Sequence, residues 1–205
     1  MGCMSDEPRL LVTDLETTGL DGRACGIVEI GAVWMLGAGE FVMKCRPHAD
    51  AVIEARAMEV NGCDWHLDPT VAAEVEALEQ FVEWVGAGPV ILCGQNPRHD
   101  LWFLQEGAKR HGLELPFVHR TLDLHTLAVA YALACGRRVP AKGYYTDEIY
   151  ELLGMEPEPK PHRALVGAQK EAEAFRMLLG LPEALEPVPY ELLSAAVAPF
   201  MDIQL

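Results

Sequence analysis

Apolar residues in the first third of the chain occur in short runs that end at turns containing glycine. Three such runs are rich in apolar or β-branched residues: Arg9 to Thr13, Ile27 to Met35 and Glu40 to Cys45. Runs of this length and composition are typical of β-strands. The pattern therefore predicts a three-stranded meander at the start of the fold.

The rest of the chain has the apolar spacing of helices, with one exception. Pro89 to Cys93 is a short apolar run and predicts a fully buried strand. Apolar residues elsewhere recur every three or four positions, which predicts helices. The predicted helices are Ile53 to Val60, Val71 to Val85, Asp100 to His111, Leu122 to Cys135, Asp147 to Leu153, Arg163 to Leu179 and Tyr190 to Val197.

This order of elements predicts one α/β domain in which helices cover a mixed sheet of about five strands. We expect a tail over residues 1–8, the domain over residues 9–180, and a helical extension packed on the same domain over residues 181–205. The proline-rich segment Glu156 to Pro161 is too short to link two domains. We interpret it as a stiff loop that delivers His162 to the next helix.

Composition limits the compartment and the way in which the protein would bind nucleic acid. Six cysteines without a C-x-x-C pair, no signal region and no apolar stretch long enough for a bilayer predict a cytoplasmic protein with no membrane contact. The formal net charge of −15 argues against a broad grip on duplex nucleic acid, which needs many Lys and Arg side chains. Any contact is expected at a small site where metal ions supply positive charge.

Two carboxylates stand two positions apart in the first strand, at Asp14 and Glu16. Alternate residues of a strand project from the same face, so these like charges repel, and a cation between them relieves the repulsion. A solvent-facing strand edge is the alternative explanation. Thr17, Thr18 and Gly19 follow directly and predict a tight turn whose hydroxyl and N–H groups can meet a ligand.

Two further clusters carry candidate chemistry. Asp100 falls in the first turn of the helix that follows the buried strand, where it either complements the helix dipole or adds a third carboxylate to a metal site. His162 begins a later helix that also contains Glu171. A single histidine at such a position is often only structural or exposed.

In their order along the chain, the three clusters resemble the DnaQ-like (DEDDh) exonucleases, which include proofreading subunits, oligoribonuclease and RNase T. Asp14 to Gly19 matches the motif D-x-E-T-T-G, and Asn96 to Leu104 matches N-x-x-x-D-x-x-F-L. The third motif, H-x-A-x-x-D-A, is matched at His162, Ala164 and Ala168, but Gly167 stands where the aspartate belongs. Three ordered motifs are a far stronger signal than any one of them.

The resemblance implies an RNase H-like fold and a 3′→5′ exonuclease that uses two Mg²⁺ or Mn²⁺ ions on single-stranded or short nucleic acid. Asp14 would bridge both ions, Glu16 would hold the ion on the side of the attacking water, Asp100 would support the second ion, and His162 would accept the proton from that water. The residues expected to contact substrate are Leu15, Thr17, Thr18, Trp65, Asn96 and Phe103, and Leu20 is a further candidate wedge against the terminal base. Core packing stays an alternative for the apolar members of this set.

Gly167 leaves three alternatives open. Glu171, one helical turn further on, reaches back as a substitute ligand. Alternatively, water completes the coordination and the enzyme is slow or prefers Mn²⁺. In the third alternative catalysis is lost, and the fold survives as a module that binds nucleic acid or a protein partner such as a polymerase. Neither the choice between DNA and RNA nor a homo-oligomeric state follows from the sequence.

Overall fold

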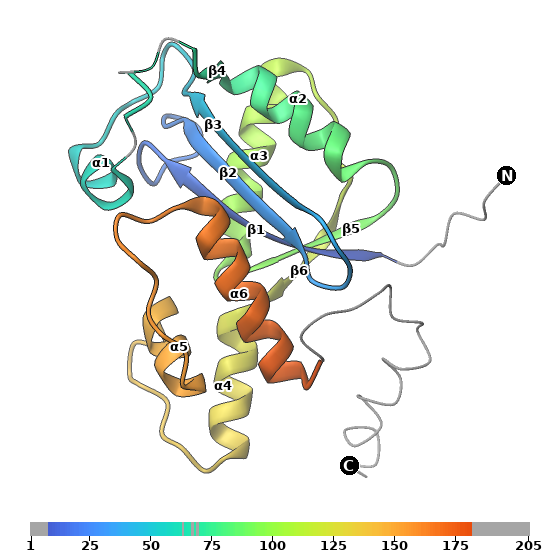
Figure 1. Cartoon of the computed structure of the whole chain (residues 1–205), viewed down its shortest axis with the longest axis vertical. Coiled ribbons are helices and arrows are strands. Elements are labelled where there is room, and N and C mark those ends of the chain that lie inside the picture. The colour runs from blue at the N-terminus through green and yellow to red at the C-terminus, as the bar shows by residue number, and fades with distance from the viewer. Residues whose placement is uncertain (1–7, 63, 67, 69, 182–205) are drawn as a thin grey trace, which may run out of the picture.

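A six-stranded sheet forms the centre of the computed structural model, which describes residues 8–62, 64–66, 68 and 70–181 (Figure 1). The strands lie in the order β4-β3-β2-β1-β5-β6. Their bounds are β1 Arg9–Thr17, β2 Ile27–Trp34, β3 Glu40–Arg46, β4 Ala72–Ala73, β5 Val90–Gly94 and β6 Phe117–Asp123. The first three form an antiparallel meander, whereas β5 pairs in parallel with β1, and β6 with β5. The predicted mixed sheet is confirmed.

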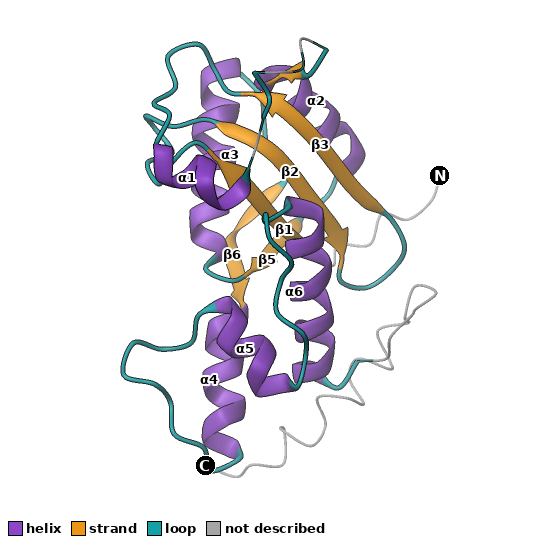
Figure 2. Cartoon of the chain, turned by 60° about the vertical axis from the view of Figure 1, so that its left-hand side comes forward, coloured by secondary structure: helices purple, strands orange, loops and turns teal. Residues whose placement is uncertain are grey.

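Helices cover both faces of this sheet. In the described part of the chain they are α1 Ala55–Asn61, α2 Glu74–Val85, α3 Pro97–His111, α4 Leu124–Ala134, α5 Thr146–Leu153 and α6 Ala164–Leu179. α2 and α3 cover one face, and α6 lies across β1 and β2 on the other. Figure 2 shows α6 on the sheet, with α4 and α5 packed beside its far end. No described helix is long and apolar enough to cross a membrane.

β1 contributes to the hydrophobic cores on both faces because its side chains alternate in direction. Leu11 and Leu15 lie in the core under α2 and α3, whereas Val12 lies in the core under α6. Asp14 and Glu16 have the phase of Val12, so they belong to the α6 face. The strand therefore places the two carboxylates beneath α6.

Two strands were missing from the sequence prediction. β6 ends at Asp123, where a helix was predicted from Leu122 onward, and this helix begins at Leu124 instead. β4 pairs Ala72 and Ala73 with β3, which delays the start of α2 to Glu74. Both are edge strands without a long apolar run, so their pairing partners, rather than their own pattern, decide their structure.

Most of the predicted terminal segments lie outside the described residues. The tail over residues 1–8 is described only at Pro8, and the extension over residues 181–205 only at Leu181. The predicted helix Tyr190 to Val197 also lies outside them. The proposed division of the chain therefore stays a prediction at both ends.

Candidate active site

The start of α6 approaches the sheet at two glycines. A Cβ atom at Gly31 of β2 would collide with the backbone of Ala164, the first residue of α6. A Cβ atom at Gly167 would collide with the carboxylate oxygen Oδ2 of Asp14. The first turns of α6 therefore lie directly on β1 and β2, with no side chain between the helix and the Asp14 carboxyl group.

Asp14 lies against Gly167, and two further carboxylates lie close enough to Asp14 for their charges to raise its pKa. Asp14 comes from β1, Asp100 from the first turn of α3 and Glu171 from α6, and the last two are only 7% and 6% exposed. Burial raises the pKa of Asp14 well above its ordinary value, and the charges of Glu171, Asp100 and then Glu16 add to this effect. Burial also raises the pKa of Glu171, and Asp100 adds the largest charge effect. A cluster of carboxylates that are all ionised is therefore unstable without a positive counter-charge.

Backbone N–H groups hold two of these carboxylates in place. Asp100 accepts hydrogen bonds from its own N–H and from that of Leu15, although burial still raises its pKa to about 7. Glu171 Oε2 accepts a hydrogen bond from the N–H of Gln95, with an N···O distance of 3.1 Å. Gln95 stands between the end of β5 and the start of α3. The junction of β5 and α3 therefore fixes Glu171, whereas the start of α3 and strand β1 fix Asp100.

Glu16 lies two residues after Asp14 on β1, near a second set of polar and charged side chains. The pKa of Glu16 is raised to about 8, chiefly by burial and then by the charges of Glu158 and Glu29, whereas Arg163 and Asn61 oppose the shift. Arg163 Nη1 donates to the Asn61 carbonyl at 3.0 Å and lies 3.8 Å from Glu29 Oε2. These contacts tie the residue just before α6 to the end of α1 and to β2.

His162 is paired with a carboxylate that the sequence analysis did not single out. Its ring nitrogen Nδ1 lies 3.4 Å from Glu158 Oε2, and the His162 side chain is 32% exposed. Glu158 is buried, which raises the pKa of its carboxyl group, while the nearby imidazole lowers it. The pair uses Nδ1 and leaves Nε2 of His162 outside this contact. The only available signal was the position of Glu158, four residues before His162 in the proline-rich loop.

The two threonines predicted to bind substrate make hydrogen bonds within the protein. Thr18 Oγ1 donates to the Val52 carbonyl at 2.6 Å and accepts from the Gly26 N–H at 2.9 Å. Thr17 Oγ1 donates to the Gly19 carbonyl at 2.8 Å. Both hydroxyl groups therefore hold the turn after β1 together, and their contact with substrate stays a prediction.

The other predicted substrate residues differ in exposure. Leu15 and Phe103 pack in the core under α2 and α3, as the alternative explanation of core packing predicts. Trp65 is half-buried, and its Nε1 atom has no hydrogen-bond partner among the described residues. Asn96 is exposed, and Leu20 is 74% exposed. Leu20, Trp65 and Asn96 therefore remain accessible for the predicted role.

The donor set suits a hard divalent cation, because the clustered groups are carboxylates and their charges repel one another. In the described part of the chain, no group of three or more His, Cys, Asp and Glu side chains is arranged to hold a metal ion. A bound ion would therefore have to draw the oxygens of Asp14, Asp100 and Glu171 closer together. The carboxylates are suitable ligands for a divalent cation, and their side chains would need to change rotamer to coordinate it.

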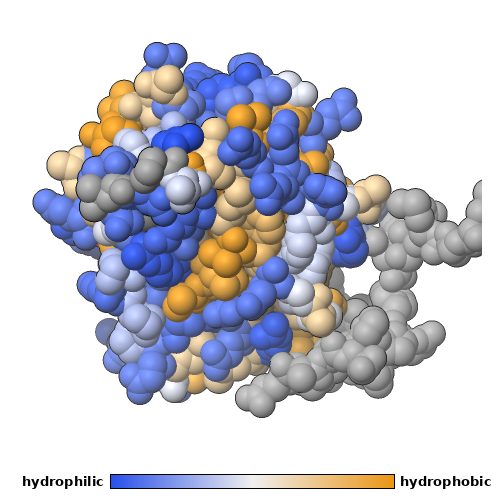
Figure 3. Space-filling view, turned by 45° about the horizontal axis from the view of Figure 1, so that its top comes forward, coloured by the Kyte–Doolittle hydropathy of each residue, from blue (hydrophilic) through white to orange (hydrophobic). Residues whose placement is uncertain are grey.

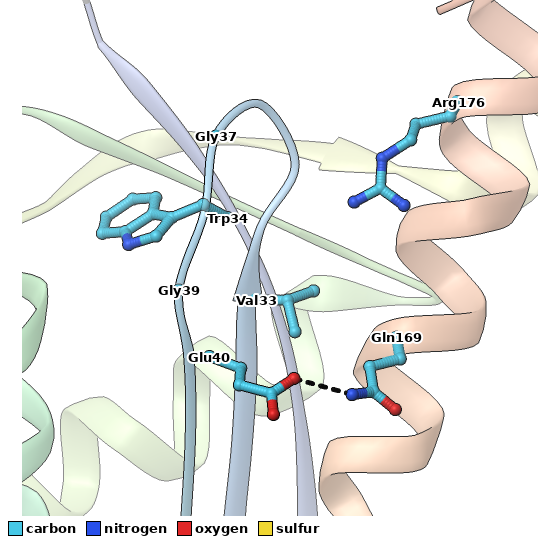
Figure 4. A pocket seen from close by; sticks show the side chains of 7 residues that line it. All are labelled: Val33, Trp34, Gly37, Gly39, Glu40, Gln169 and Arg176. Atoms are coloured by element: carbon cyan, nitrogen blue, oxygen red, sulfur yellow. Dashed lines mark hydrogen bonds between the residues drawn. The ribbon is translucent and has the colours of Figure 1, made fainter. Parts of the chain in front are cut away.

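A separate pocket of about 270 Å³ opens between α6 and the β2–β3 hairpin (Figure 4). It is lined by Val33, Trp34, Gly37, Gly39, Glu40, Gln169 and Arg176. Gln169 Nε2 donates to Glu40 Oε2 across it at 2.7 Å. None of the clustered carboxylates lines this pocket, so the candidate site lies elsewhere on α6.

The carboxylate cluster lies within a segment of the chain that matches a known protein family. The sequence model of the RNase T family, described as exonuclease, matches residues 11–175 and so spans the chain from β1 to α6. The chain belongs to this exonuclease family. Its match includes every part of the carboxylate cluster and His162.

Similar proteins agree with membership of the exonuclease family. The PolC-type DNA polymerase III of Thermotoga maritima is 30% identical over 171 residues, which cover 80% of this chain and 11% of the relative. The chain thus spans about a tenth of the length of that polymerase. A structure of exonuclease I has a TM-score of 0.69 at 17% identity and covers 84% of this chain and 41% of the other. The nuclease domain of 3′hExo, a DEDDh family member bound to rAMP, has a TM-score of 0.63 at 17% identity and covers 86% and 94%. The RNase H-like fold is thereby confirmed.

Proposed function

We propose that this chain is a divalent-metal-dependent 3′→5′ exonuclease that acts on single-stranded or short nucleic acid. The observation that carries the proposal is the convergence of Asp14, Asp100 and Glu171 beside Glu16 and His162, within a fold of the exonuclease family. Clustered carboxylates with raised pKa values, next to a histidine, are typical of sites that use divalent cations for hydrolysis.

Each residue has a role that follows from its position. Asp14, Glu16 and Asp100 would hold Mg²⁺ or Mn²⁺ ions, two by resemblance to the family. Such ions make bound water more acidic and stabilise negative charge that develops on a phosphate. Glu158 would keep the proton on Nδ1 of His162, so that Nε2 accepts the proton of the attacking water.

The charge of the molecule favours a short stretch of contact with a single strand. With a net charge of −15, the surface repels a long duplex, so binding energy has to come from the site and from nearby bases. Leu20 and Trp65 are accessible and offer apolar contact to a base in any sequence.

A second candidate function is a binding module without catalysis. Gly167 favours it, because the resemblance places a metal-binding aspartate there. The similarity to part of a PolC-type polymerase would then suggest a polymerase as partner. Nuclease activity distinguishes the two functions.

The test is trimming of a single strand labelled at its 5′ end, with Mg²⁺ or Mn²⁺. We expect a ladder of shortened labelled products, whereas a strand labelled at its 3′ end should release its label as a mononucleotide at once. Asp14→Ala and Glu16→Ala should each abolish trimming without loss of folding, since removing a repelling carboxylate rarely destabilises an empty metal site. Early release of the 5′ label, or full activity of either variant, would contradict the proposal.

A further inference from the structure

The space beside Gly167 is already occupied. The position that a Cβ atom would take at this residue is well inside van der Waals contact with Oδ2 of Asp14, and it lies 3.0 Å from Cγ of the same side chain. Asp14 therefore fills the space from which a side chain at Gly167 would project. An aspartate at this position would force the Asp14 carboxyl group to move.

Glu171 places a carboxylate in the cluster from one helical turn further along α6. Its side chain is buried, and Oε2 lies 3.1 Å from the Gln95 nitrogen and 3.2 Å from the position of a Cβ atom on Gly94. The same position on Gly94 lies 3.3 Å from the carbonyl oxygen of Thr13 on β1 and 3.7 Å from Cβ of Pro97, the first residue of α3. The Glu171 carboxylate therefore lies between β1, beside the residue that precedes Asp14, and the start of α3.

A buried hydroxyl group points to a second partner for this carboxylate. Tyr150 of α5 is fully buried, and its Oη atom has no hydrogen-bond partner in the described structure. Nζ of Lys170, the residue next to Glu171 on α6, lies 4.8 Å from the centre of the Tyr150 ring, so Tyr150 packs against the turn of α6 that carries Glu171. An unsatisfied buried hydroxyl is costly, and a carboxylate that turned toward it would remove that cost.

We propose that Glu171 is the carboxylate that binds the divalent cation in place of a side chain at Gly167, and that the Tyr150 hydroxyl orients it. This inference rests on the proposed function, since it assigns a ligand within the same site. Glu171 carries the required negative charge from the same helix, so the total number of acidic ligands stays at four with Asp14, Glu16 and Asp100. The competing explanation is that Glu171 only anchors the β5–α3 junction through Gln95.

Metal binding and stability of the whole chain distinguish the two roles of Glu171. Mn²⁺ affinity is measured from the electron paramagnetic resonance signal of free Mn²⁺, and the melting temperature is measured with and without Mn²⁺. Glu171→Gln keeps an oxygen that can accept from Gln95 but removes the charge. We expect Mn²⁺ affinity to fall about tenfold or more, with the metal-free melting temperature unchanged or higher. Glu173→Gln, an exposed position on the same helix, is the matched control and should bind like the wild type.

Two results would show that Glu171 does not bind the cation. Wild-type Mn²⁺ affinity in Glu171→Gln, or a lower metal-free melting temperature with an unchanged rise on adding Mn²⁺, would overturn the inference and leave Glu171 as an anchor. The proposed function survives that result. If the wild-type chain itself binds no Mn²⁺, both the inference and the metal-dependent function fail.

Two further variants test the parts of the inference separately. Gly167→Asp should not raise Mn²⁺ affinity, because the new Cβ atom displaces the Asp14 carboxyl group; a higher affinity than that of the wild type would overturn the substitution by Glu171. Tyr150→Phe should lower Mn²⁺ affinity by about tenfold, as loss of a group that orients a ligand does. Unchanged affinity in Tyr150→Phe would remove Tyr150 from the proposal.

Discussion

The pair of Glu158 and His162 shows how one carboxylate can determine the chemistry of another residue. A histidine has two ring nitrogens, and a partner on one of them decides which nitrogen is free to accept a proton. Glu158 lies 3.4 Å from Nδ1. Because Glu158 is buried and also accepts a hydrogen bond from the Arg163 N–H at 3.4 Å, its carboxyl group is held in one place. These contacts hold the imidazole in one orientation.

We therefore expect His162→Ala to lower the turnover rate about a hundredfold, and Glu158→Gln to lower it about tenfold, with little change in KM. Because Glu158 acts through His162, the double variant should be no slower than His162→Ala alone. Steady-state rates of all four proteins form the cycle that checks this. Reductions that multiply in the double variant would show that the two residues act independently.

At the scale of elements, the contact between α6 and the sheet depends on the absence of a side chain at Gly31. Both Gly167 and Glu171 belong to α6, so the position of this helix sets the position of the acidic cluster relative to Asp14. The atoms that a Cβ on Gly31 would meet are backbone atoms of Ala164 and Leu165, which have no rotamer to change. Relief would require movement of the whole helix.

Gly31→Ala should therefore destabilise the fold by about 1–3 kcal/mol, as overpacking of a tight contact does. It should also weaken Mn²⁺ binding, because α6 moves away from β1. Urea unfolding followed by fluorescence measures the first effect. Val42→Ala, at the exposed position paired with Gly31 on β3, is the control and should change stability by less than about 0.5 kcal/mol. Equal stability of Gly31→Ala and the wild type would disprove this account of the helix contact.

On the scale of the whole molecule, a locally basic segment stands out against the acidic background. Figure 3 shows hydrophilic residues over much of one face, interrupted by hydrophobic patches, and the chain has 31 acidic and 16 basic residues. The connection between α4 and α5, residues 135–145, contains Arg137, Arg138 and Lys142 but no acidic residue. It runs back along α4 toward the start of α5 (Figure 1), where Gln95 Nε2 donates to the Tyr144 carbonyl at 3.4 Å. This segment therefore leads from the surface to the cluster.

Replacing Arg138 and Lys142 together by alanine should weaken binding of a short single strand and flatten its dependence on salt. The slope should fall by about 0.7 for each phosphate group that the variant no longer binds. Both residues are exposed, and neither forms an ion pair within the described residues. Binding titrations at several NaCl concentrations give the slope. Lys109→Ala, also exposed but near the end of α3 opposite to Asp100, is the control. An unchanged slope in the double variant would exclude this segment from the binding path.

The sequence determined those features that depend on local periods. Alternation along β1 places Asp14 and Glu16 on one face, and the order of strands and helices predicts the mixed sheet that the structure has. The spacing of the three motifs supplied the resemblance to the exonucleases, and the family match confirms it. The sequence predicts these features because side-chain direction in a strand or helix repeats over a few residues.

Only the tertiary structure decided which groups meet. It brings Glu171 to Asp14 across more than a hundred residues of sequence, fills the space beside Gly167 with the Asp14 carboxyl group, and adds Tyr150 and Glu158 to the cluster. It also places Phe103 in the core and adds the edge strand β6. Burial, charge coupling and strand pairing depend on contacts between segments that are distant along the chain, and no local period encodes those contacts.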